Sequence, residues 1–131
     1  MLTRHDPDTV PTAIAGYTQG MELAPGARLY FISGQIPERP GQELPLDFRG
    51  QCEAVWQNII AMLEDADMTV ENLVKVTTFL TSREYVQENR EVRQHYLGDT
   101  QPAMTVVIAQ TVDVRWLLET EAIAVRYDGK D

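Results

Sequence analysis

Two glutamates in the last apolar stretch of the chain have the spacing that most directly suggests chemistry. Glu119 and Glu121 are separated by one residue, and a β-strand places residues two apart on the same face. Leu117 and Ile123 continue that face, so we expect both carboxyl groups among apolar side chains. Crowding and partial burial raise the pKa of a carboxyl group and make it a general acid or base. A solvated face, or an ion pair with an arginine across a subunit interface, would explain the same spacing without catalysis.

The other reactive side chains are isolated in the sequence. His5 lies in a polar N-terminal segment and His95 near the end of a predicted helix, so neither has a partner at metal-ligand spacing. Cys52 recurs with apolar residues on one helix face, which favours a buried thiol over a nucleophile. The chain has no Gly-rich phosphate loop and no HExxH, CxxC or GxSxG motif. We therefore expect neither a metal nor a cofactor.

Composition narrows the class of protein. The 131 residues carry 20 acidic and 11 basic side chains, a formal charge of −9, which repels nucleic acid and anionic membranes. A hydrophobic content of 44% predicts one folded domain spanning residues 1–131. The single cysteine suits a reducing compartment, and the N-terminus has no apolar stretch of signal-peptide length. The expected location is the cytoplasm, with a small molecule as the partner rather than nucleic acid or membrane.

Hydrophobic periodicity predicts the elements that position these residues. Apolar residues at three- and four-residue spacing predict a helix that Asp47 caps and that ends near Asp67. A second helix is expected between a Ser82 cap and Gly98. The prolines of segment 37–47 predict a loop. Strands are expected at 30–33, 73–81, 103–110 and 115–127, and one more within 13–23, joined to the first by a turn at 24–27.

This order, β-β-α-β-α-β-β, predicts an α+β fold with two helices on one face of a mixed sheet. Strand 73–81 carries apolar side chains on both faces, although the helices can cover only one. An uncovered apolar face favours a closed homo-oligomer.

Five segments, in order and at compatible lengths, resemble motifs of the Rid family. These are the reactive intermediate deaminases of YjgF type, also labelled L-PSP endoribonucleases or translation inhibitors. The segments are AIAGYTQG, LYFISGQIP, NLVKVTTFLT, REVRQHYLGDTQPAM and LLETEAIAV. The resemblance covers nearly the whole chain. It implies a chorismate-mutase-like subunit, a homotrimer whose sheets form a central barrel, and three clefts between neighbouring subunits, without a cofactor.

The resemblance also implies which residues line the cleft. Tyr17 and Ser33 fall where cleft-lining residues sit, and Glu119 falls on the glutamate proposed to orient or activate the attacking water. In members that hydrolyse enamines and imines, an arginine in the PAR segment grips the substrate carboxylate. Met104 stands there in this chain, and a thioether neither donates hydrogen bonds nor carries charge. Val106 likewise replaces a cysteine that many members have.

A second departure from the family accompanies the first. Arg90 stands at a helix position where many members carry a cleft asparagine. One hypothesis is that Arg90 supplies the cation that Met104 lacks. The alternative is that Arg90 points to solvent, on a helix face shared with Glu91 and Arg93.

The leading functional interpretation is a Rid-like protein that binds a small metabolite in inter-subunit clefts. It could hydrolyse an imine or enamine other than simple 2-imino acids, and Met104 favours an apolar or aromatic one. The alternative is a catalytically silent metabolite-binding or regulatory trimer. An endoribonuclease or translation inhibitor ranks last, because the chain is acidic and has no His/Lys catalytic cluster.

Overall fold

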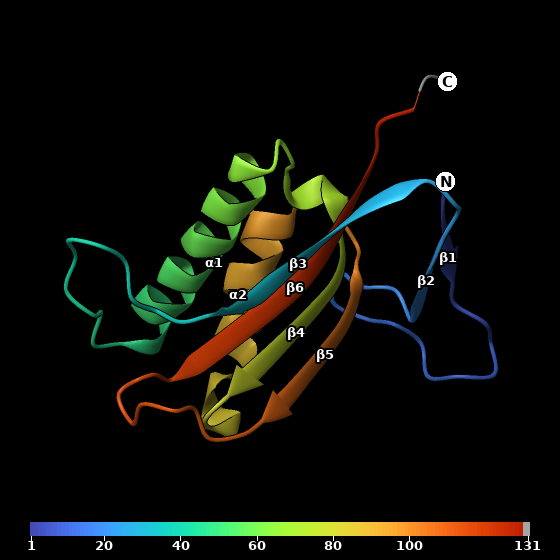
Figure 1. Cartoon of the computed structure of the whole chain (residues 1–131). Coiled ribbons are helices and arrows are strands. Elements are labelled where there is room, and N and C mark those ends of the chain that lie inside the picture. Colours follow the sequence, from blue (N-terminus) through green and yellow to red (C-terminus); the bar gives the residue numbers. More distant parts are fainter. Residues whose placement is uncertain (130–131) are drawn as a thin grey trace.

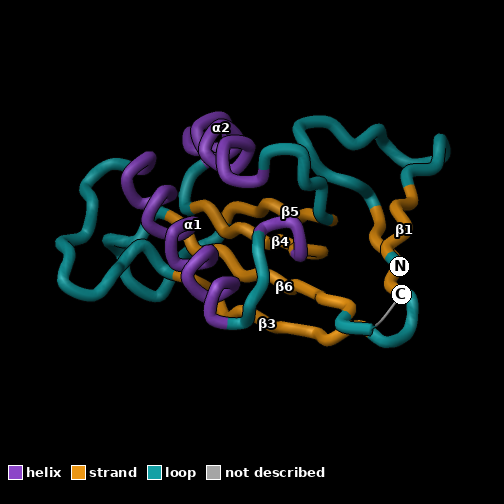
Figure 2. Tube along the Cα trace, turned by 90° about the horizontal axis from the view of Figure 1, so that it is seen from above, coloured by secondary structure: helices purple, strands orange, loops and turns teal. Residues whose placement is uncertain are grey.

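Two helices pack on one face of a four-stranded sheet in the computed structural model, which describes residues 1–129 (Figures 1 and 2). The strand order is β3-β6-β4-β5, in which only the β4–β5 pair is parallel. The predicted mixed sheet with both helices on one side is therefore confirmed. The elements are β3 Ala27–Gln35, α1 Phe48–Asp65, β4 Leu73–Leu80, α2 Val86–Leu97, β5 Ala103–Ile108 and β6 Leu118–Tyr127.

The N-terminal region differs from the prediction. A strand β2, Gly20–Leu23, pairs with a strand β1, Leu2–His5, in a separate two-stranded sheet. It does not pair with β3, so the predicted hairpin across residues 24–27 is wrong; β3 pairs instead with β6 from the other end of the chain. The sequence of β1, LTRH, is exposed at every position. Because no side of β1 is buried, it has no apolar alternation that could reveal it.

The helix ends follow the predicted capping residues. The Asp47 side chain accepts a hydrogen bond from the Gly50 amide at 3.0 Å and caps α1. Ser82 caps a single 3-10 turn, Arg83–Tyr85, which leads directly into α2. Gly98 follows α2 with a φ of 57°, a left-handed conformation that glycine adopts without strain. Neither helix of the described chain is long and apolar enough to cross a membrane.

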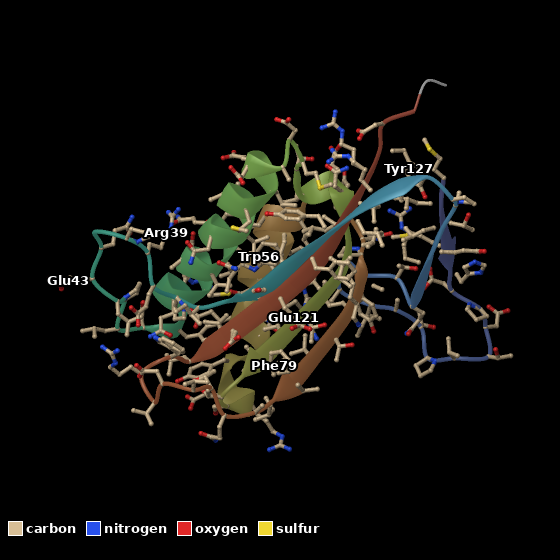
Figure 3. The ribbon with its side chains drawn as sticks, viewed as in Figure 1. Arg39, Glu43, Trp56, Phe79, Glu121 and Tyr127 are labelled. Carbon is tan, nitrogen blue, oxygen red and sulfur yellow. The ribbon has the colours of Figure 1, made fainter. Side chains whose placement is uncertain are left out.

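The two faces of the four-stranded sheet have different environments. On the helix side, Val76 and Leu80 of β4 and Leu118 of β6 are fully buried against α1 residues such as Trp56. The other face lies open in the single chain. It carries Phe79, Glu121 and the other strand residues that alternate with the helix-facing ones (Figure 3). We refer to it as the bare face. Its residues are Leu29, Phe31 and Ser33 of β3, Lys75, Thr77 and Phe79 of β4, Thr105 and Val107 of β5, and Glu119, Glu121 and Ile123 of β6.

Candidate functional site

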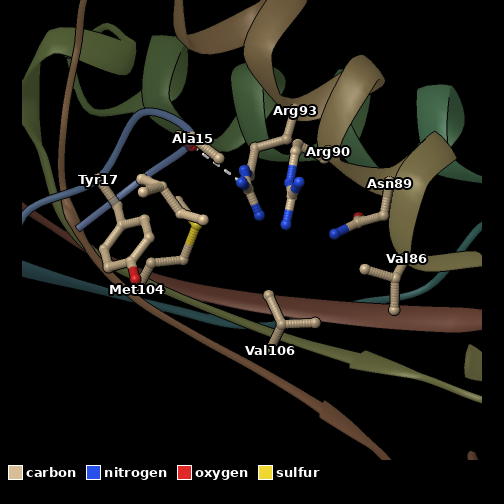
Figure 4. Close-up of a pocket in the computed structure, with 9 residues that line it drawn as sticks. Ala15, Tyr17, Val86, Asn89, Arg90, Arg93, Met104 and Val106 are labelled. Atoms are coloured by element: carbon tan, nitrogen blue, oxygen red, sulfur yellow. Dashed lines mark hydrogen bonds between the residues drawn. The ribbon is translucent and has the colours of Figure 1, made fainter. Parts of the chain in front are cut away.

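A pocket of about 250 Å³ lies between α2, the edge strand β5 and the loop that precedes β2 (Figure 4). We call it the α2–β5 pocket. It brings together three of the five candidate site residues, Tyr17, Arg90 and Met104. Its lining consists of Ile14, Ala15, Tyr17, Val86, Asn89, Arg90, Arg93, Met104 and Val106.

Helix and strand periodicity explain why these side chains converge. Arg93 follows Asn89 by four residues and Arg90 by three, spacings that place all three on neighbouring positions of one helix surface. Met104 and Val106 are two residues apart in β5 and therefore project to the same side of the sheet. The result is a wall of hydrogen-bond donors on α2 that faces an apolar floor on β5, as Figure 4 shows.

Arg93 is buried in this wall, with only 5% of its surface exposed. Its Nη2 donates to the Ala15 carbonyl at 3.0 Å, and its Nε has no hydrogen-bond partner among the described residues. Burial, and secondarily the charge of Arg90, lower the pKa of Arg93. The expectation that Arg93 belongs to a solvated helix face is wrong. Its place four residues after the buried Asn89, at the edge of the apolar side of the helix, was the only sequence signal.

The loop that carries Tyr17 is fixed to α2 by an unusual backbone conformation. Ala15 has a φ of 63° and Gly16 a φ of 79°, both in the left-handed region. A Cβ at Gly16 would lie 2.6 Å from the amide group of the exposed Gln94 side chain, which would have to move, and the left-handed φ itself favours glycine at this position. This conformation turns the Ala15 carbonyl toward Arg93. Tyr17 is therefore held from two sides, by the Ala15–Arg93 hydrogen bond before it and by the Thr18 amide after it, which donates to the Pro102 carbonyl at 3.1 Å.

Cys52 lies behind the pocket wall and contacts the pocket residue Asn89. Its thiol donates to Asn89 Oδ1, with a separation of 3.7 Å between sulfur and oxygen. Burial raises the pKa of this thiol to about 12, so it remains a protonated donor at neutral pH. The predicted buried, unreactive thiol fits this position. With its oxygen bonded to Cys52, the Asn89 amide nitrogen is directed into the pocket, as Figure 4 shows.

Ser33 and Glu119 lie elsewhere in the chain. Both are on the bare face, whereas the α2–β5 pocket lies on the helix side of the sheet. The β3–β6 register shifts between Ile32 and Gln35, and a Cβ at Gly34 would overlap the Glu119 carboxylate. Ser33 lines a second hollow of about 370 Å³, together with Lys75, Thr77 and Glu121 among others. The five candidate residues thus fall into two groups separated by the sheet, a division that periodicity alone does not reveal.

The histidines lie apart from the pocket. His5 Nε2 is 2.7 Å from Glu22 Oε1 across the β1–β2 pair, and His95 contacts the edge of the Tyr96 ring. Within residues 1–129, no cluster of three or more histidine, cysteine or acidic side chains is arranged to hold a metal ion. The chemistry of the α2–β5 pocket is therefore that of its arginines, amide and phenol.

Comparison with known proteins gives a consistent result. The family model described as Endoribonuclease L-PSP matches residues 8–126. A RutC family protein of Pyrococcus abyssi is 32% identical over 119 residues, which cover 89% of this chain and 91% of that protein. TdcF of Escherichia coli, named as a candidate reactive intermediate deaminase, is 32% identical over 120 residues, covering 88% and 91%.

Solved structures share the fold. A Rid family protein of unknown function from Yersinia pestis, YyfB, superposes with a TM-score of 0.84 over 95% of this chain and 98% of its own, at 22% identity. A candidate endoribonuclease from Thermotoga maritima superposes with a TM-score of 0.70 at 33% identity, covering 95% and 97% of the two chains.

Proposed function

This chain belongs to the Endoribonuclease L-PSP family, which includes the Rid proteins. From this premise we propose that it binds a small carboxylate-bearing metabolite in the α2–β5 pocket and hydrolyses an imine or enamine there. The family supports the reaction class. The pocket supports the way in which the metabolite is held.

The observation that carries the proposal is the position of Arg90 in the pocket wall, facing the floor to which Met104 belongs. None of the side chains that line the α2–β5 pocket is acidic, so Arg90 is available to a ligand. A guanidinium group binds a carboxylate through two parallel hydrogen bonds. Met104 and Val106 offer an apolar surface to the carbon skeleton of the ligand. Arg90 thereby replaces, from the opposite wall, the arginine that the family carries at position 104.

The reaction requires a water molecule and a group that moves its protons. The water oxygen forms a bond to the C=N carbon, and the nitrogen gains protons. The C–N bond then breaks, giving a carbonyl compound and ammonia. We assign the proton transfers to Glu119 as general base and acid. Because Glu119 lies on the bare face, this role requires a neighbouring subunit to present it to the pocket.

A homotrimer, the assembly that the family resemblance implies, is part of the proposal. Leu29 and Phe31 are 53% and 67% exposed on the bare face, and Val107 is 41% exposed. Burial of these side chains against another copy of the chain would remove apolar surface from water. Such a packing would also bring Ser33 and Glu119 of one subunit to the β5 edge of the next. A lone buried thiol and a charge of −9 support a cytoplasmic protein that does not act on RNA.

The test is ammonia release from freshly generated imino acids with apolar, aromatic and acidic side chains. The wild type is expected to be active. Arg90→Ala should raise KM by roughly 30- to 4000-fold, which corresponds to the about 2–5 kcal/mol lost when one partner of a desolvated charge pair is truncated. Glu119→Gln should lower kcat with little effect on ligand affinity. Full activity of Arg90→Ala on every substrate would exclude Arg90 as the anchor.

A second candidate, a metabolite-binding trimer without catalysis, is favoured by one observation. Glu119 and the α2–β5 pocket lie on opposite faces of the sheet within a chain. Parallel assays of Met104→Arg separate the two functions. An inactive wild type with an active Met104→Arg variant would mean an intact scaffold that takes a different ligand. Inactivity of both proteins, with retained ligand binding, would favour the second candidate.

A further inference from the structure

We infer that the α2–β5 pocket selects ligands with two negative charges, and that its ligand is a small dicarboxylate held by Arg90 and Arg93 together. The inference rests on the proposed function and deepens it, because it makes the substrate an imine derived from an acidic amino acid. Its starting point is Arg93, a buried cation whose bonding within the chain is incomplete.

Arg93 differs from the ion-paired arginines in what it contacts. Elsewhere in the described part of the chain, Arg39 donates to the neutral side-chain oxygens of Gln57 and Asn58, whereas Arg28, Arg49, Arg115 and Arg126 form ion pairs with carboxylates. Their side chains are 41–63% exposed. Arg93 is 5% exposed, and its one hydrogen bond is to a neutral carbonyl group. A buried charge is costly unless an opposite charge accompanies it, and among residues 1–129 no carboxylate forms an ion pair with Arg93.

The surroundings of Arg93 add positive charge and no negative charge. Helix α2 contributes the polar groups of Arg90 and Asn89 to the pocket, and β5 contributes only the apolar side chains of Met104 and Val106. The loop contributes the neutral residues Ile14, Ala15 and Tyr17. Figure 4 shows the guanidinium groups of Arg90 and Arg93 side by side, directed from α2 toward the space above Val106. One carboxylate would leave one of these cations uncompensated, whereas two carboxylates would match both.

The dimensions of the pocket limit the size of this ligand. A volume of about 250 Å³ is below the range of roughly 300–1,000 Å³ for drug-sized ligands. The two arginines are three residues apart on one helix, which places their Cβ atoms about 5–6 Å from each other. Each planar guanidinium matches a planar carboxylate. A short dicarboxylate satisfies both arginines, while its methylene carbons rest on the apolar floor.

Calorimetric titration of the wild type with succinate and succinamate tests the inference. In succinamate a neutral amide of nearly the same shape replaces one carboxylate. We expect succinate to bind at least about 10-fold more tightly, as for loss of one charge-assisted bond. Equal affinities, or no binding of succinate, would overturn the inference. Tighter binding of inorganic phosphate than of succinate would also overturn it and indicate a phosphoryl ligand instead.

A matched pair of variants assigns the selectivity to Arg93. Arg93→Gln removes the charge but keeps a donor for the Ala15 carbonyl, and it should bring the two affinities to within about 3-fold. Arg126→Gln is the control. Arg126 also donates to the carbonyl of a left-handed residue, Asp67, but it lies outside the α2–β5 pocket. The selectivity of this control should equal that of the wild type, and an unchanged selectivity in Arg93→Gln would contradict the role of Arg93.

The titrations separate this inference from the proposed function. Selective binding of succinate without any imine hydrolysis would refute the proposed reaction and leave the dianion site intact. Hydrolysis of monocarboxylate imines, with equal affinity for succinate and succinamate, would refute the dianion site alone. If Arg93→Gln fails to fold, the comparison of the two ligands on the wild type still decides.

Discussion

The buried Cys52 thiol gives the protein a pH-dependent stability that one substitution should remove. Burial raises the pKa of this thiol from 9.0 to about 12, so the folded state keeps a proton that the unfolded chain loses. The folded-state pKa is the higher of the two. The contribution of Cys52 to stability is therefore fully present below pH 9.0 and is lost progressively as the pH rises toward about 12.

The expected magnitude follows from the same shift. Each pH unit above the unfolded pKa removes about 1.4 kcal/mol from the free energy of unfolding. Between roughly pH 9 and roughly pH 10.5, Cys52 should thus account for a loss of about 2 kcal/mol. In Cys52→Ala this loss is absent, although removal of the sulfur atom lowers stability by a constant amount at every pH.

Urea denaturation of the wild type and Cys52→Ala across this pH range is the assay. Tyr96, whose pKa burial also raises, is present in both proteins, so most of its titration cancels in the difference between them; only its small coupling to the charge of Cys52 remains. The difference in unfolding free energy between the wild type and Cys52→Ala should shift by about 2 kcal/mol in favour of the variant between roughly pH 9 and roughly pH 10.5. If the two proteins lose stability in parallel, the pKa of the thiol is the same in the folded and unfolded states, and the reasoning from burial is wrong.

Three further predictions concern the core, the loop and the bare face. Trp56→Ala, which empties a site 1% exposed and stacked on Tyr96, should lower the free energy of unfolding by about 3–5 kcal/mol in urea denaturation. Gly16→Ala should lower the free energy of unfolding by about 1–2 kcal/mol from the left-handed conformation alone. Gly41→Ala is its control, because Gly41 has a φ of 76° and no neighbour within 4 Å. A greater loss of stability in Gly41→Ala than in Gly16→Ala would contradict the packing of Gly16 against Gln94. In light scattering the wild type should have roughly three times the chain mass of 14.8 kDa, and Phe31→Asp on the bare face should reduce it toward that of one chain.

The regular elements were predictable because their residues alternate between two environments. Helix α1 and strand β4 each bury one side, and apolar residues recur with the period of that side. The strand β1 was not predictable, because its four residues are all exposed and its pairing with β2 is made by backbone hydrogen bonds and one exposed contact between His5 and Glu22. A hydrophobic period arises only where one side of an element is buried, so it cannot predict an element with no buried side.

The candidate site was predictable in part for a similar reason. Tyr17, Arg90 and Met104 come from distant segments that the resemblance to family motifs assigned to one cleft, and all three line the α2–β5 pocket. Arg93 was missed because an arginine beside Glu91 and Arg90 has the sequence pattern of a solvated helix face. Only the fold shows that the loop at Ala15 covers this position. For Glu119, the two-residue period of the strand predicted which residues share its face, but it did not predict which face of the sheet the helices cover.

The contact between Arg93 and Ala15 joins residues 78 positions apart, and this separation links ligand affinity to local unfolding. Residues 1–17 contribute no fully buried side chain, so this segment should detach at a lower free energy than the core. Detachment removes one wall of the pocket, and a bound ligand therefore stabilises the attached state by mass action. Saturating ligand should slow hydrogen exchange at the Thr18 amide, which bonds to the Pro102 carbonyl at 3.1 Å, while exchange in the sheet core stays the same. The free energy needed to detach the N-terminal segment should thus indicate whether a ligand occupies the α2–β5 pocket.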